Sequence, residues 1–166
     1  MKKVSLIAGL MLLVAGMAWA QSDSHTVTVT VNEINAINVD NDVTLTINAA
    51  TAGENPTPVS DNTTANLLWT TNAAQNAAKN IQVRTGGALP DGITLTVQAQ
   101  NLTKKNDGGS TGSSAGTVTL STTEQNFITG TYKCAGQCDL NYTASATADA
   151  DVGNHVITVT YTITNS

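Results

Sequence analysis

Apolar and polar residues alternate with a period of two along most of this chain. In residues 25–31, for example, Val27, Val29 and Val31 alternate with threonine. Further stretches of this kind fall at residues 34–39, 43–47, 67–69, 81–83, 93–99, 118–120, around 127, 138–144 and 157–163. A period of two puts the apolar side chains on one face of a β-strand. The sequence therefore predicts about nine or ten strands.

Residues typical of turns separate these stretches. Residues 86–92 contain two glycines followed by Pro90 and Gly92, and residues 104–116, KKNDGGSTGSSAG, form the longest polar segment. The first segment is expected to turn before a strand, and the second to be a mobile loop. Residues 73–79 lack an apolar stripe and predict a single helical turn at most. Short strands with turn-rich joints favour an all-β protein with a single antiparallel β-sandwich, immunoglobulin-like or jelly-roll-like.

The first 20 residues have the composition of a secretion signal. Lys2 and Lys3 precede an apolar run, and Ala18 and Ala20 form a small-x-small cleavage site. The sequence thus predicts a signal peptide over residues 1–20 and a β-sandwich domain over residues 21–166. The apolar run is too short to cross a bilayer, so no membrane insertion is expected. The cleaved protein is expected in the periplasm, at the cell surface or in the medium.

The charge balance narrows the range of partners. The whole chain has 12 acidic residues and a net charge of −5, and the loss of Lys2 and Lys3 would take the net charge to −7. Nucleic acids and anionic lipids bind proteins with clustered lysine and arginine. The sequence therefore predicts a protein that does not bind nucleic acid.

Two segments carry a resemblance to known proteins. Residues 89–95, LPDGITL, and the closing residues 156–163, VITVTYTI, resemble secreted bacterial immunoglobulin-like sandwiches. Many members of that class are surface or fibre subunits. The resemblance implies a structural role at the cell surface, with other copies of the chain or other surface proteins as partners.

Cys134 and Cys138 are the only cysteines. The intervening Ala-Gly-Gln is typical of a short loop between two strands, and an oxidising compartment preserves disulfides. We therefore predict a structural disulfide between Cys134 and Cys138 across a hairpin. A redox pair is the alternative, but such motifs have two intervening residues and lie at the start of a helix.

The remaining candidate residues each have a simple structural explanation. Loop aspartates at residues 40, 42, 149 and 151 could bind calcium, but the full loop pattern of a calcium site is missing. Trp69 could stack on a sugar, although a tryptophan in a sandwich core is more common. His25 and His155 have no nucleophile motif nearby. We therefore predict no catalytic residue, no metal ligand and no cofactor, and hence a protein that is not an enzyme.

The function predicted from these features is that of a secreted structural subunit of an extracellular fibre, pilus (fimbrium) or matrix. The candidate assembly strand consists of Thr26, Val27, Thr28, Val29, Thr30 and Val31. Such a strand can add to the sheet edge of a neighbouring subunit, or it can be the first strand of its own sandwich. The alternative function is a secreted module that binds carbohydrate or another cell-surface component.

Overall fold

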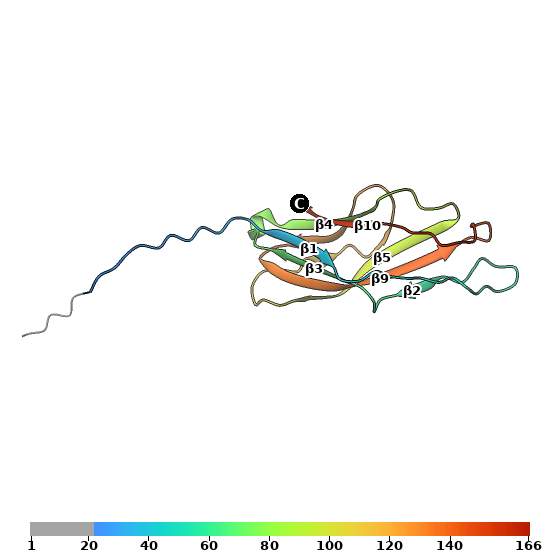
Figure 1. Ribbon diagram of the computed structural model, residues 1–166, viewed down its shortest axis with the longest axis horizontal. Coiled ribbons are helices and arrows are strands. Elements are labelled where there is room, and N and C mark those ends of the chain that lie inside the picture. Colours follow the sequence, from blue (N-terminus) through green and yellow to red (C-terminus); the bar gives the residue numbers. More distant parts are fainter. Residues whose placement is uncertain (1–21) are drawn as a thin grey trace, which may run out of the picture. The chain divides into compact units, whose positions relative to one another are not determined.

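The computed structural model describes residues 22–166, and the predicted signal peptide at residues 1–20 lies outside them. Contacts divide the chain between Val31 and Asn32, and the compact domain spans Asn32–Ser166. The domain is built almost wholly from antiparallel strands (Figure 1). Within residues 22–166, no helix has the length and apolar character needed to cross a membrane.

The larger of the two sheets has six strands. Its strands are β1 (Asn35–Val39), β2 (Val59–Asp61), β3 (Asn66–Thr71), β5 (Ile93–Lys104), β7 (Thr117–Thr119) and β9 (Cys134–Ala146). Their order is β1-β3-β9-β5-β7, and β2 pairs with β9 beyond the end of β3. The long central strand β9 thus pairs with three other strands, all antiparallel.

The second sheet has four strands. They are β4 (Lys79–Thr85), β6 (Ser113–Ser114), β8 (Gln125–Thr131) and β10 (Val159–Asn165), in the order β10-β4-β8-β6. The register between β4 and β8 shifts near Ile81, as at a β-bulge. The shift accompanies two successive buried residues, Phe127 and Ile128, which interrupt the alternation of β8.

The core is formed by inward-facing residues of both sheets, as the alternation predicts. The larger sheet contributes Leu67, Val97 and Leu140 among others, and the second sheet contributes Ile81, Val83, Phe127 and Tyr161. The rings of Phe127 and Tyr161 lie 5.2 Å apart at an angle of 57°. The predicted all-β fold, an antiparallel sandwich of about ten strands, is confirmed.

Two smaller predictions have different outcomes. The helical turn is present as η1 (Gln75–Ala77), as expected. The expected loop at residues 104–116 instead includes the end of β5 and the whole of β6. The ammonium of Lys104 donates to the carbonyl oxygens of Asp107, Gly108 and Gly109, so local hydrogen bonds give this loop a defined path.

Residues 43–47 were predicted to be a strand, and they belong to none. Their alternation is nevertheless reflected in their burial. Val43 and Leu45 are half-buried against the core, while the threonines between and after them are exposed. The segment is thus extended and faces the core on one side, but no neighbouring strand pairs with its backbone among the described residues.

Candidate functional site

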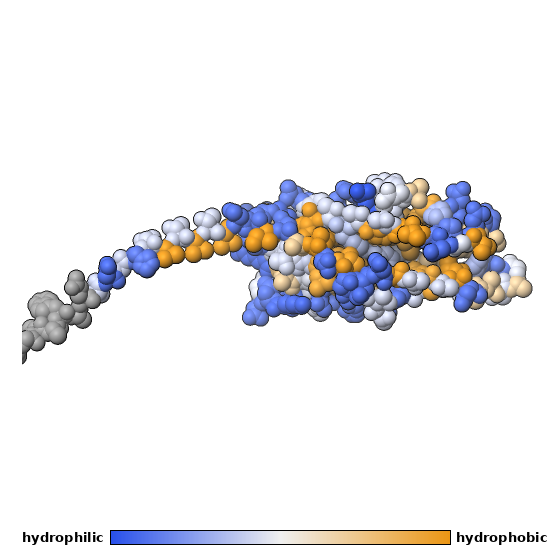
Figure 2. All heavy atoms as spheres, in the orientation of Figure 1, coloured by the Kyte–Doolittle hydropathy of each residue, from blue (hydrophilic) through white to orange (hydrophobic). Residues whose placement is uncertain are grey.

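Residues 25–31, named the arm from here on, form the most apolar exposed segment of the described chain. Val27, Val29 and Val31 are 72%, 79% and 73% exposed. Figure 2 shows hydrophobic atoms in a row along one side of this segment. The structure assigns residues 25–31 to no strand.

Residues 32–34, which connect the arm to β1 and are named the base of the arm, are held in place by Asn72, which follows β3. Its side-chain carbonyl accepts a hydrogen bond from the backbone N–H of Ile34 at 2.7 Å. Its amide donates to the backbone carbonyl of Asn32, also at 2.7 Å, and its own N–H donates to the carbonyl of Ile34. These bonds hold residues 32–34 as an extended continuation of β1, alongside the end of β3.

Lys79, at the start of β4, adds a charged contact at the same place. Its side chain is only 7% exposed, and its ammonium lies 2.8 Å from the carboxylate of Glu33 and 2.7 Å from the side-chain carbonyl of Asn165. Hydrogen bonds from Lys79 and then from Asn35 lower the pKa of the Glu33 carboxyl below its usual value. One lysine therefore ties the base of the arm to the end of β10.

The predicted disulfide between Cys134 and Cys138 is wrong for this structure. Both thiols are free, and both residues lie on the single continuous strand β9, with no hairpin between them. Their Cα atoms are four residue steps apart on an extended strand, a separation of about 13 Å. A disulfide requires a Cα separation below about 7 Å. Both cysteines are instead buried core residues, 2% and 1% exposed.

The burial of Trp69 decides between the two roles considered for it, stacking on a sugar and packing in the core. The residue is 2% exposed, and its indole N–H donates to the hydroxyl of Thr131 at 2.9 Å. The indole ring packs directly over Gly136 of β9. A tryptophan buried in this way offers no open ring face for stacking on a sugar, so Trp69 is a core residue.

The loop aspartates do not come together. The carboxylate of Asp40 accepts hydrogen bonds from the backbone and side-chain amides of Asn66, which lower its pKa, the backbone bond most. The pKa of Asp149 is lowered mainly by the hydroxyl of Thr147. No group of three or more acidic, histidine or cysteine residues that could hold a metal ion occurs among residues 22–166.

The two histidines also lie apart from any reactive side chain. The Nε2 atom of His155 lies 2.9 Å from the backbone carbonyl of Asp151. His25 is an exposed residue of the arm. Within the described residues, no hydrogen bond joins either imidazole to a serine, threonine or cysteine side chain.

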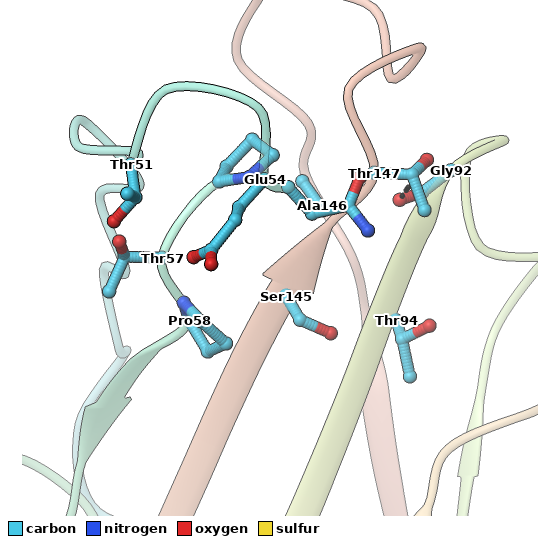
Figure 3. A pocket seen from close by; sticks show the side chains of 11 residues that line it. Thr51, Glu54, Thr57, Pro58, Gly92, Thr94, Ser145, Ala146 and Thr147 are labelled. Carbon is cyan, nitrogen blue, oxygen red and sulfur yellow. Dashed lines mark hydrogen bonds between the residues drawn. The ribbon is translucent and has the colours of Figure 1, made fainter.

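One surface pocket, of about 600 Å³, lies at the end of the larger sheet (Figure 3). It is lined by the loop before β2, including Glu54 and Thr57, and by the adjoining ends of β5 and β9, including Thr94 and Ser145. Figure 3 shows the carboxylate of Glu54 directed into the space between the loop and β9. This pocket could not be predicted from the sequence, because its residues come from three distant segments of the chain.

The pocket offers hydrogen-bonding groups without a catalytic arrangement. Glu54 is the only acidic or basic side chain in its lining, and the other polar groups are hydroxyls and amides. Asn55 is already engaged, since its side-chain carbonyl accepts from the backbone N–H of Ala148. The lining could bind a small polar molecule, but it pairs no nucleophile with a general base.

Comparisons with known proteins add no relative. A scan against protein-family models gave no match, and neither did searches of curated proteins and of solved structures.

Proposed function

We propose that this chain is an exported structural subunit that polymerises at the cell surface by strand addition, with the arm as the donated strand. The observation that carries the proposal is the exposure of the three valines of the arm, on a segment with the alternation of a sheet strand. Monomeric soluble proteins rarely leave a contiguous apolar surface in water without a partner. Burial of each valine would contribute about 1.5–3 kcal/mol.

The anchoring of residues 32–34 also supports this role. Asn72 and Lys79 fix the point at which the arm leaves the domain. A strand whose attachment point is already fixed loses less conformational entropy on docking than a strand attached by a long flexible linker. Donation of one strand from each copy to the next is a head-to-tail contact, which extends into an open filament unless the rotation closes a ring.

The alternative, a carbohydrate-binding module, has less support. It would have used Trp69 as a stacking platform, and that side chain is buried. The pocket near Glu54 has no aromatic residue in its lining.

Two matched substitutions in the arm test the proposed function. Val29→Asp puts a charge on the apolar side of the arm, and Thr28→Asp puts the same charge on the opposite side. We expect the unaltered exported protein and Thr28→Asp to form filaments under negative-stain electron microscopy, and Val29→Asp to remain monomeric. Circular dichroism should be the same for all three, because the arm lies outside the compact domain.

Deletion of residues 22–31 behind an intact signal provides a second test. The proposal predicts a folded monomer that no longer polymerises. A truncated chain that fails to fold, together with a full-length protein that stays monomeric at high concentration, would show that strand donation is wrong.

A further inference from the structure

The hydrophobic core of the domain is only partly covered along one strip of the surface, where the hydrophobic side chains are half-buried. Nine half-buried hydrophobic residues pack against the core, and six of them lie on only two segments of the chain. These six residues, named the seam from here on, are Ile37, Val43 and Leu45 on one segment and Ile157, Val159 and Ile163 on the other. Figure 2 shows hydrophobic atoms in a band along the domain, in the region where Figure 1 draws β1 and β10.

The seam lies where the edges of the two sheets meet. β1 is the last strand of the larger sheet and pairs only with β3, and β10 is the last strand of the second sheet and pairs only with β4. The two edge strands contact each other. Along the extended residues 41–49 and 154–158, which follow β1 and precede β10, the described chain forms no strand ladder. Both sides of the seam thus present backbone groups that can pair with an added strand.

The opposite edges of the two sheets end in very short strands. There the edge strands are β7, with three residues, and β6, with two. Very short edge strands are one way in which proteins prevent unwanted pairing. Val118 of β7 and the adjacent Leu120 are buried, so the core has no half-covered line along β7.

We propose that the seam is the acceptor site for the arm of a second copy of this chain. This inference rests on the proposed function and adds the surface that receives the strand. The arm and the segment 157–163 have equal lengths of seven residues, about 23 Å when extended, and their apolar side chains share a period of two. The valines of the arm would cover the half-buried residues of the seam.

Charge also favours a second copy as the occupant. Neither the arm nor the segments 43–47 and 157–163 contain an aspartate, glutamate, lysine or arginine. The whole chain carries a net charge of −5, so its copies repel one another over most of their surfaces. Pairing of the uncharged arm along residues 43–47 and 157–163 would place no like charges together, and the acidic residues of the first seam segment, Asp40 and Asp42, lie between Ile37 and Val43.

The arm cannot easily fill the seam of its own domain. Only residues 32–34 separate the arm from β1, and their hydrogen bonds to Asn72 hold them extended. To lie beside β1, the arm would have to reverse direction within these three residues. A reversal would break the contacts with Asn72 and the ion pair between Glu33 and Lys79.

Disulfide trapping between two copies of the full exported chain tests the acceptor site. One copy carries Thr28→Cys in the arm, and a second, affinity-tagged copy carries Thr44→Cys or Thr46→Cys beside the seam. The matched control copy carries Thr119→Cys on β7, and all three acceptor threonines are exposed. The native thiols are buried and do not compete. After mild oxidation, mixed dimers are quantified on non-reducing gels and checked for reversal by dithiothreitol.

We expect at least fivefold more mixed dimer with Thr44→Cys or Thr46→Cys than with Thr119→Cys, because a disulfide requires close strands. An equal or greater yield with Thr119→Cys would overturn the seam as the acceptor. Filaments that are lost in Val29→Asp, without trapping at the seam, would reject the acceptor site and leave strand donation standing. A protein that is monomeric by light scattering and untrapped at every position would reject both.

Discussion

At the scale of single residues, Gly136 leaves the space that the buried indole of Trp69 occupies. A glycine between two cysteines in the sequence also indicates a loop, and the predicted hairpin and disulfide depend on that interpretation. In the structure Gly136 lies within the continuous strand β9, directly beneath the indole of Trp69. Nothing in the local sequence distinguishes the two roles, because the partner tryptophan is 67 residues away along the chain.

This role predicts the effect of Gly136→Ala. A Cβ atom at this position would lie 2.5 Å from the Cε2 and Cζ2 atoms of Trp69, so the indole would have to move. We expect a loss of about 1–3 kcal/mol in the free energy of unfolding, the usual cost of overpacking a core. Chemical denaturation followed by tryptophan fluorescence measures it.

Gly87→Ala is the matched control for this substitution. Gly87 has no atom within 4 Å of an added Cβ and no positive φ, so stability should be unchanged or slightly raised. An unchanged stability for Gly136→Ala as well would contradict the packing role assigned to Gly136.

At the scale of elements, the alternation in the sequence reports which side chains face the core. It does not report which strand pairs with the backbone. Residues 43–47 alternate as clearly as many strands of the domain, and Val43 and Leu45 do face the core, yet no ladder forms there. Hydrogen-bonded pairing is set by neighbours distant in sequence, so the strand order and the open seam could not be predicted from the local pattern.

The contact between β9 and β10 connects the two sheets through a pair of tyrosines. The hydroxyls of Tyr142 and Tyr161 lie 2.8 Å apart and are buried. Tyr142→Phe or Tyr161→Phe alone would leave the other hydroxyl buried without this partner, and we expect each to cost about 1–3 kcal/mol. The double substitution should cost clearly less than the sum of the two, since it removes both polar groups.

A double-mutant cycle from urea denaturation measures this coupling. Tyr132→Phe, in the connection between β8 and β9, is the control and should change stability by less than about 0.5 kcal/mol. Strictly additive losses for Tyr142 and Tyr161 would show that the two hydroxyls act independently.

At the scale of the whole molecule, the sequence was sufficient for the fold class. Short alternating segments separated by turn residues allow few arrangements other than antiparallel sheets packed face to face. The candidate site was less accessible to prediction. The arm could be identified from its three valines, but the seam combines Val43 and Leu45 with Ile157 and Val159, and only the tertiary structure brings these residues to one line.

The whole molecule should also lose stability at alkaline pH, because its core buries groups that ionise there. Burial raises the pKa of Cys138 to about 12 from a reference value of 9.0, with a smaller contribution from the charge of Asp139. Burial likewise raises the pKa of Cys134, Tyr142 and Tyr161 above their reference values. Each group keeps its proton in the folded protein at a pH where the unfolded chain releases it.

This stabilisation is fully present below about pH 9 and is lost as the pH rises toward 12. The free energy of unfolding should fall by about 1.4 kcal/mol per pH unit for each proton that only the unfolded chain releases. Urea midpoints at pH 7, 9, 10 and 11 measure the slope. Cys138→Ser is less stable at pH 7, since the hydroxyl replaces a buried thiol, but its slope between pH 9 and 11 should be smaller because one titrating group is gone. A midpoint that stays constant to pH 11 would mean that these core groups ionise as readily in the folded protein as in the unfolded chain, and an equal slope in Cys138→Ser would mean the same of the Cys138 thiol alone.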